Sequence, residues 1–78
     1  MQKWLMGKAH CQDILVQYYL LKGENRSYGV SVETERETAQ VLDLTPSRQK
    51  AECLANSLAR GAVTPVCLRD VVDDWLLK

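Results

Sequence analysis

The sequence predicts an α+β fold, in which a three-stranded antiparallel β-meander is followed by a two-helix hairpin packed on one face of the sheet. Two observations predict this fold: residues 14–33 have the pattern of paired strands, and apolar residues recur at helical spacing after residue 45. With 78 residues, the chain has room for one domain. We expect a single domain of residues 12–78, preceded by an amino-terminal lead segment of residues 1–11.

The strands are predicted from composition and from alternation. Residues 14–21 (ILVQYYLL) are rich in β-branched, aromatic and leucine side chains, which favour strands. Gly23 and Asn25 mark a turn, and from residue 28 to residue 33 apolar residues alternate with small or polar ones. A shorter run with strand character follows this hairpin. The three strands are therefore expected near residues 13–22, 26–34 and 38–44.

The helices are predicted from apolar spacing and from their start and stop signals. Thr45 is the expected N-cap of the first helix and Pro46 its first residue, where the missing N–H of proline has no cost. Gly61 is the expected stop, and Thr64-Pro65 repeats the start signal. The helices are expected near residues 46–60 and 65–77. Leu54, Leu58, Leu68, Val72 and Trp75 are expected to pack on Tyr28, Val30 and Val32. In the alternative, Trp75 is a surface anchor for a partner.

The run at residues 14–21 is apolar on both faces, although short connections would place it at an edge of the meander. Such an edge exposes apolar side chains, and a symmetric partner would bury both copies of it. We therefore expect a homodimer. In the alternative, the chain is a monomer whose own amino terminus covers the edge. The expected partner interface consists of Leu15, Tyr19, Leu21 and Trp4.

The three cysteines, Cys11, Cys53 and Cys67, lack the even number and framework spacing of a disulfide scaffold. We expect two of them to be small buried residues and one to lie near the amino terminus. A metal site formed with His10 is the alternative. Zinc ligands normally occur in close pairs such as C-x-x-C, which this chain lacks, so we expect no metal and no cofactor.

The sequence contains no recognisable catalytic arrangement. His10 is the one histidine, and its neighbour Cys11 lies beside it in sequence, whereas a catalytic pair normally comes together from separate segments. Asp70, Asp73 and Asp74 could bind a metal or share a proton, but a polar helix face explains them more simply. There is no glycine-rich phosphate loop. We therefore expect a protein that is not an enzyme.

Ten basic and ten acidic residues give a formal net charge of zero. The chain therefore lacks the strong net positive charge that is typical of a dedicated nucleic-acid binder. A local patch remains at the start of the first predicted helix, where Ser47, Arg48 and Lys50 form a candidate anion site. A small nucleic-acid-associated regulator is therefore the alternative function. The acidic residues of the second predicted helix argue against it, because they repel phosphates.

The amino terminus lacks the features of a signal peptide, and the longest apolar run is far shorter than the roughly 20 residues of a spanning helix. We expect a cytoplasmic protein without membrane contact. The expected function is that of a small protein-interaction or regulatory module that acts as a homodimer.

Two segments carry a resemblance to known proteins: YGVSVE at residues 28–33 and LTPSRQKAECLANSLARGAVTPVCLRDVVDDWL at residues 44–76. They resemble a family of short uncharacterised proteins from Firmicutes, especially Clostridia, over about residues 14–77. The resemblance implies a domain of unknown function in a bacterial cytoplasm and brings no catalytic residues. Residues 1–12 lie outside it.

Overall fold

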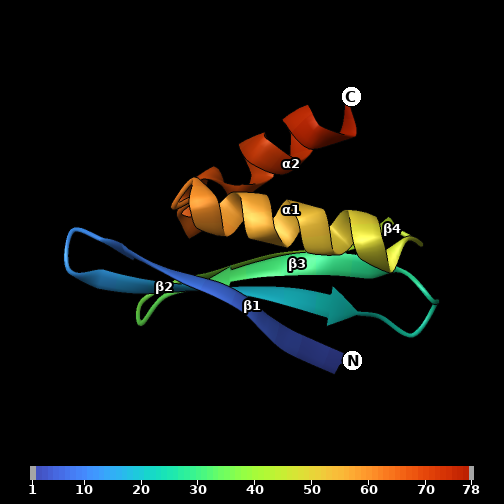
Figure 1. Ribbon diagram of the computed structural model, residues 1–78, viewed down its shortest axis with the longest axis horizontal. Coiled ribbons are helices and arrows are strands. Elements are labelled where there is room, and N and C mark those ends of the chain that lie inside the picture. Colours follow the sequence, from blue (N-terminus) through green and yellow to red (C-terminus); the bar gives the residue numbers. More distant parts are fainter. Residues whose placement is uncertain (1, 78) are drawn as a thin grey trace.

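The computed structural model describes residues 2–77 and contains one antiparallel sheet with its helices on a single face (Figure 1). The four strands are neighbours in chain order, and the helices follow the last strand. The strands are β1 (Gln2–Cys11), β2 (Ile14–Lys22), β3 (Tyr28–Glu33) and β4 (Thr38–Thr45). The helical elements are α1 (Arg48–Arg60), the short 3₁₀ helix η1 (Pro65–Cys67) and α2 (Leu68–Leu76).

The predicted α+β class, with its antiparallel sheet and two helices, is confirmed, but the prediction of three strands is wrong. The segment expected to be a lead forms β1, which pairs with β2 from Gln2↔Lys22 to Cys11↔Ile14. The two strands are joined by a tight turn in which Gln12 and Asp13 have φ of 50° and 67°. Turns with two positive φ values fit the twist of a hairpin and normally contain glycine or asparagine, so this turn carries no familiar sequence signal.

The fourth strand changes the position of β2, which was expected at an edge. Because β1 and β3 flank it, β2 is an interior strand. The side of β2 that faces the helices is buried, with Val16, Tyr18 and Leu20, whereas Leu15 and Tyr19 on its other side are half-buried. The edges of the sheet are β1 and β4 instead.

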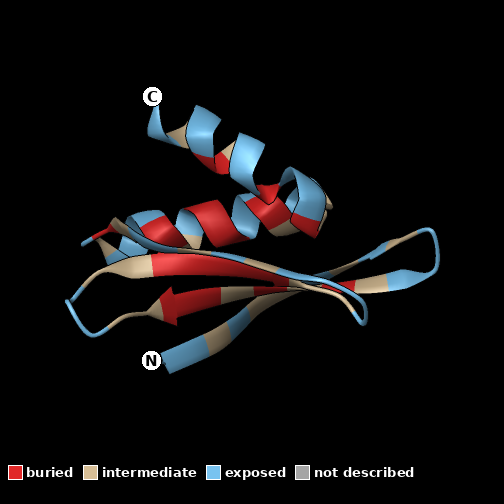
Figure 2. Cartoon of the chain, turned by 180° about the vertical axis from the view of Figure 1, so that it is seen from behind, coloured by how far each residue is buried: buried red, intermediate tan, exposed pale blue. Residues whose placement is uncertain are grey.

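The core lies between the sheet and the helices, and most of its predicted members are confirmed (Figure 2). Trp75 is half-buried and packs against this core, whereas Tyr28 is half-buried and is not part of the cluster. The cluster of buried residues consists of Val16, Tyr18, Val30, Val32, Leu54, Ala55, Leu58, Leu68 and Val72.

Helix α1 begins two residues later than expected. Its N-cap is Ser47, whose hydroxyl accepts a hydrogen bond from the backbone N–H of Lys50 at 3.3 Å, and the predicted N-cap Thr45 instead ends β4. The stop at Gly61 is confirmed. Helix α1 lies so close to β1 that a Cβ on Gly7 would come within 2.8 Å of the Ala59 Cβ.

Helix α2 leaves the body of the domain as it proceeds. It starts beside the end of α1 and rises away from the sheet toward its carboxyl end (Figures 1 and 2). Leu68 and Val72 are buried, whereas Leu76 and Leu77 are 56% and 87% exposed. The buried face of α2 and the half-buried Trp75 therefore hold the helix to the core, whereas Leu76 and Leu77 at its end stay exposed.

One buried hydroxyl ties the sheet to the connection between the helices. Tyr18 of β2 is fully buried, and its hydroxyl donates a hydrogen bond to the backbone carbonyl oxygen of Val63 at 2.8 Å. A buried carbonyl without a partner is costly, so this bond helps to hold the 61–64 connection against β2.

We expect Tyr18→Phe to lower the free energy of unfolding by about 1–2 kcal/mol, because it leaves the Val63 carbonyl without this donor while it keeps the ring in the core. Urea unfolding at neutral pH measures the loss. Tyr19→Phe is the matched control, since the Tyr19 hydroxyl bonds only to the side chain of Gln17, at 3.2 Å. Equal losses in both variants would contradict a role for the Val63 contact.

The same contact makes stability sensitive to alkaline pH. Burial raises the pKa of the Tyr18 hydroxyl above its ordinary value of 10.0, and electrostatic repulsion from Cys11 adds to the shift. A raised pKa means that the folded state favours the protonated form, so this stabilisation is complete below pH 10 and is lost as the pH rises beyond it. The difference in unfolding free energy between wild type and Tyr18→Phe should therefore shrink above pH 10.

Candidate functional site

Two surfaces of the folded domain leave apolar side chains exposed or half-buried. The first is the open face of the sheet, opposite the helices (Figure 1). The second is a groove between α1, the end of β4 and the second half of α2. They lie on different sides of the molecule, so each can be tested separately.

The open face carries three apolar side chains from β1 and β2. Leu5 is 47% exposed, and its register partner Tyr19 is half-buried. Leu15, also half-buried, lies further along β2 opposite His10. The predicted interface residues Leu15 and Tyr19 are thus on a face that both helices leave uncovered.

Polar contacts surround Tyr19 on this face. The Lys3 ammonium lies 4.2 Å from the centre of the Tyr19 ring and forms an ion pair with Glu33. Glu33 also accepts a hydrogen bond from the Ser31 hydroxyl at 3.2 Å. Polar residues on one face of an antiparallel sheet are typical of a solvated surface, so this face is less apolar than the sequence suggested.

The other two predicted interface residues are not available on this face. Leu21 alternates onto the same side of β2 as Tyr19, but it is 1% exposed and so has no surface to offer a partner in the folded chain. Trp4 is half-buried, and the Arg48 guanidinium at the start of α1 lies 4.8 Å from the centre of its ring. The four residues therefore do not form one surface.

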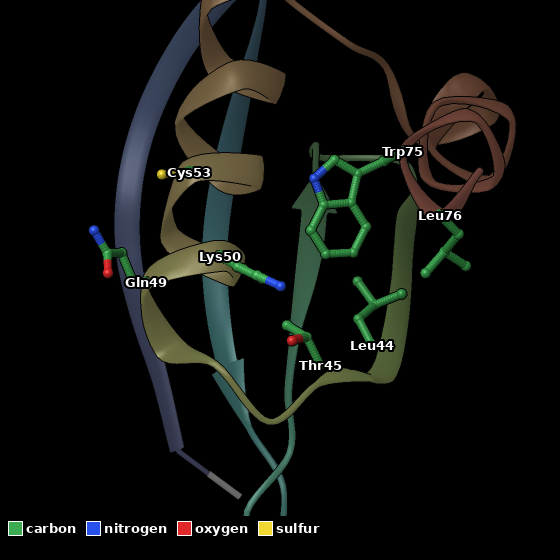
Figure 3. Close-up of a pocket in the computed structure, with 7 residues that line it drawn as sticks. All are labelled: Leu44, Thr45, Gln49, Lys50, Cys53, Trp75 and Leu76. Carbon is green, nitrogen blue, oxygen red and sulfur yellow. The ribbon is translucent and has the colours of Figure 1, made fainter. Parts of the chain in front are cut away.

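The candidate anion site is also divided between different contacts. The Ser47 hydroxyl caps α1, and Arg48 Nε donates to Glu52 Oε1 at 2.8 Å while its guanidinium stacks on Trp4. Lys50 points instead toward the groove (Figure 3). Arg48 is thus committed to protein partners, which weakens the start of α1 as an anion site.

The groove has a volume of about 680 Å³ and brings the end of α2 beside the junction of β4 and α1 (Figure 3). The Trp75 indole extends from α2 into the space between α1 and β4, close to Leu44. Lys50 is the one charged residue among those that line it. The lining consists of Leu44, Thr45, Gln49, Lys50, Cys53, Trp75 and Leu76.

Sequence reasoning did not find this groove. It placed Trp75 and Leu76 on the apolar face of the second helix, with a surface anchor for a partner as the alternative for Trp75, and it connected neither of them with Leu44. A signal was present, because Leu76 and Leu77 extend the apolar content of α2 beyond the stripe that a single core can cover. Such an excess often marks a surface that contacts another protein.

The cysteines and acidic residues differ partly from expectation. Cys53 and Cys67 are exposed rather than buried, because they lie off the buried stripes of their helices, and Cys11 is half-buried in β1. Across residues 2–77, no group of three His, Cys, Asp or Glu side chains is placed to hold a metal ion. No helix within the same range is long and apolar enough to cross a membrane.

Comparison with known proteins gives one assignment. The search of curated proteins and the search of solved structures gave no match. Residues 6–78 match DUF6514, a family of unknown function, which confirms the resemblance to such a family and extends it into β1. Since the match covers nearly the whole sequence, the chain belongs to the DUF6514 family.

Proposed function

We propose that the protein is a non-enzymatic interaction module that works as a homodimer. The observation that supports this proposal is the apolar surface at the end of α2. Trp75 remains half-buried beside the groove, and Leu76 and Leu77 are 56% and 87% exposed. Clustered exposed apolar side chains are uncommon on soluble monomers and commonly mark sites of protein contact.

The size of the domain favours a second copy as the partner. A core in a domain of this size rarely supplies more than about 3–5 kcal/mol, so small domains commonly gain stability from association. A two-fold dimer buries the same exposed surface twice with a single contact. The exposed Leu76 and Leu77 at the end of α2 would gain most.

The contacts of Arg48 favour this proposal over a nucleic-acid-associated regulator. Arg48 pairs through Nε with Glu52 and stacks on Trp4, so a neighbouring carboxylate offsets part of its charge and protein contacts hold its side chain. Phosphate contacts by basic residues supply much of the affinity for nucleic acids. The remaining basic residue of the candidate anion site, Lys50, lies beside an apolar groove.

Sedimentation equilibrium of the purified chain tests the proposal. We expect a dimer at low micromolar concentration, because a functional module must associate at concentrations that cells reach. A monomer at every concentration up to the solubility limit would contradict it.

Tyr19→Lys separates the two candidate surfaces. If Tyr19→Lys remains dimeric, the interface predicted from Leu15 and Tyr19 is wrong. If it becomes monomeric with an unchanged circular dichroism spectrum, the homodimer forms through the open face of the sheet.

A further inference from the structure

We infer that the groove beside Trp75 receives the second half of α2 from a second copy of this chain, so that Lys50 of each copy pairs with Asp73 of the other. This inference rests on the proposed homodimer and names its interface. The apolar part of the contact is Leu76 of one copy against Trp75 and Leu44 of the other.

The charges of the two helices support a second copy as the occupant. Helix α1 contains three basic residues and one acidic residue, whereas α2 contains one basic residue and three acidic residues. Lys50 of α1 forms no ion pair with α2 among residues 2–77, and α2 rises away from α1 toward its carboxyl end (Figure 1). In the proposed two-fold dimer, the second half of each α2 lies in the partner's groove beside the partner's α1, so that an acidic helix faces a basic one at both symmetric contacts.

Lys50 and Asp73 are the residues best placed for this pairing. Lys50 is exposed at the groove, and it forms no ion pair with any residue in the range 2–77. Asp73 is exposed and precedes Leu76 by one helical turn, so both lie on the same flank of α2. A partner helix that inserts Leu76 therefore carries Asp73 toward the rim that holds Lys50.

The shape of the groove favours protein side chains over a small ligand. Sites for small molecules enclose most of the ligand surface. This groove is instead the open space beneath a tilted helix, bounded by side chains of α1, β4 and α2 (Figure 3). A helix that presents leucines to such a space is a common mode of recognition.

Charge reversal provides the test. Lys50→Glu alone places two carboxylates at each symmetric contact, and Asp73→Lys alone places two ammonium groups there. We expect either variant to raise the dimer dissociation constant about tenfold or more in low salt. An equimolar mixture of the two variants should recover dimers. In a mixed dimer, the carboxylate introduced at position 50 of one variant faces the ammonium introduced at position 73 of the other, and the unchanged Asp73 faces the unchanged Lys50. Sedimentation equilibrium of each variant alone and of the mixture measures both effects.

Lys8→Glu is the matched control, since Lys8 is an exposed lysine on β1, away from the groove. It should leave the dissociation constant unchanged, and circular dichroism should show that all variants fold. Recovery of dimers in the mixture would support the inference. If the dimer resists both charge reversals, or if only Tyr19→Lys disrupts it, this interface is wrong but the proposed homodimer stands. A wild-type monomer would overturn both proposals.

Discussion

Leu58→Ala should lower the free energy of unfolding by about 2–5 kcal/mol, which is a large share of the stability of so small a domain. Leu58 is 0% exposed in α1 and belongs to the core cluster between the helices and the sheet. Truncation to alanine removes buried methyl groups and leaves a cavity that the surrounding strands and helix can only partly fill. Urea unfolding followed by circular dichroism measures the loss.

Leu77→Ala is the control, because Leu77 is 87% exposed just beyond α2. The same truncation there should change the stability of the monomer by less than about 0.5 kcal/mol. The comparison is made at a concentration below that of dimerisation. A loss under about 1 kcal/mol for Leu58→Ala would contradict its place in the core.

The helices could be predicted because their signals are local. The spacing of Ala51, Leu54 and Leu58 specifies one buried face of α1, and Gly61 marks its end. The N-cap was misplaced by two residues, since Thr45 and Ser47 both suit that position and the structure extends β4 through Thr45. Local patterns predict the existence of a helix better than its first residue.

β1 could not be predicted because its evidence lies in pairing with β2. The turn at Gln12 and Asp13 lacks glycine, and Gly7 interrupts the strand where the register shifts between Leu5 and Gly7. Gly7 has a packing reason, since α1 comes close to the sheet at Ala59. Both features weaken the alternation that identifies a strand in sequence, although both serve the folded structure.

The groove could not be predicted because it depends on the angle between α2 and the rest of the domain. The sequence placed Trp75 on the apolar stripe of α2, and the structure keeps it against the core. Helical spacing cannot show that η1 directs α2 away from α1, which leaves Leu76 exposed. The direction of a short helix is set by a few tertiary contacts, here those of the buried Pro65, Leu68 and Val72.

Gly29→Ala should destabilise the domain by about 1–3 kcal/mol or more, because β4 leaves no space for a side chain at this position. A Cβ on Gly29 would overlap the backbone carbonyl oxygen of Val41 and lie 2.9 Å from the Cα of Leu42. The pairing of β3 with β4 shifts register at this point, and Asp43 has a φ of 55°. Backbone atoms cannot rotate away as a flexible side chain can, so β4 must move.

Gly23→Ala distinguishes this steric effect from the general loss of a glycine. Gly23 lies in a connection, and a Cβ there meets its nearest neighbour, Asp43 Oδ1, at an ordinary contact distance of 3.6 Å. We expect its unfolding free energy to stay within about 0.5 kcal/mol of wild type, and amide exchange in β4 to stay slow. Faster exchange confined to β4 in Gly29→Ala would locate the damage at the register shift. Equal stability of the two variants would show that β4 does not require glycine at residue 29.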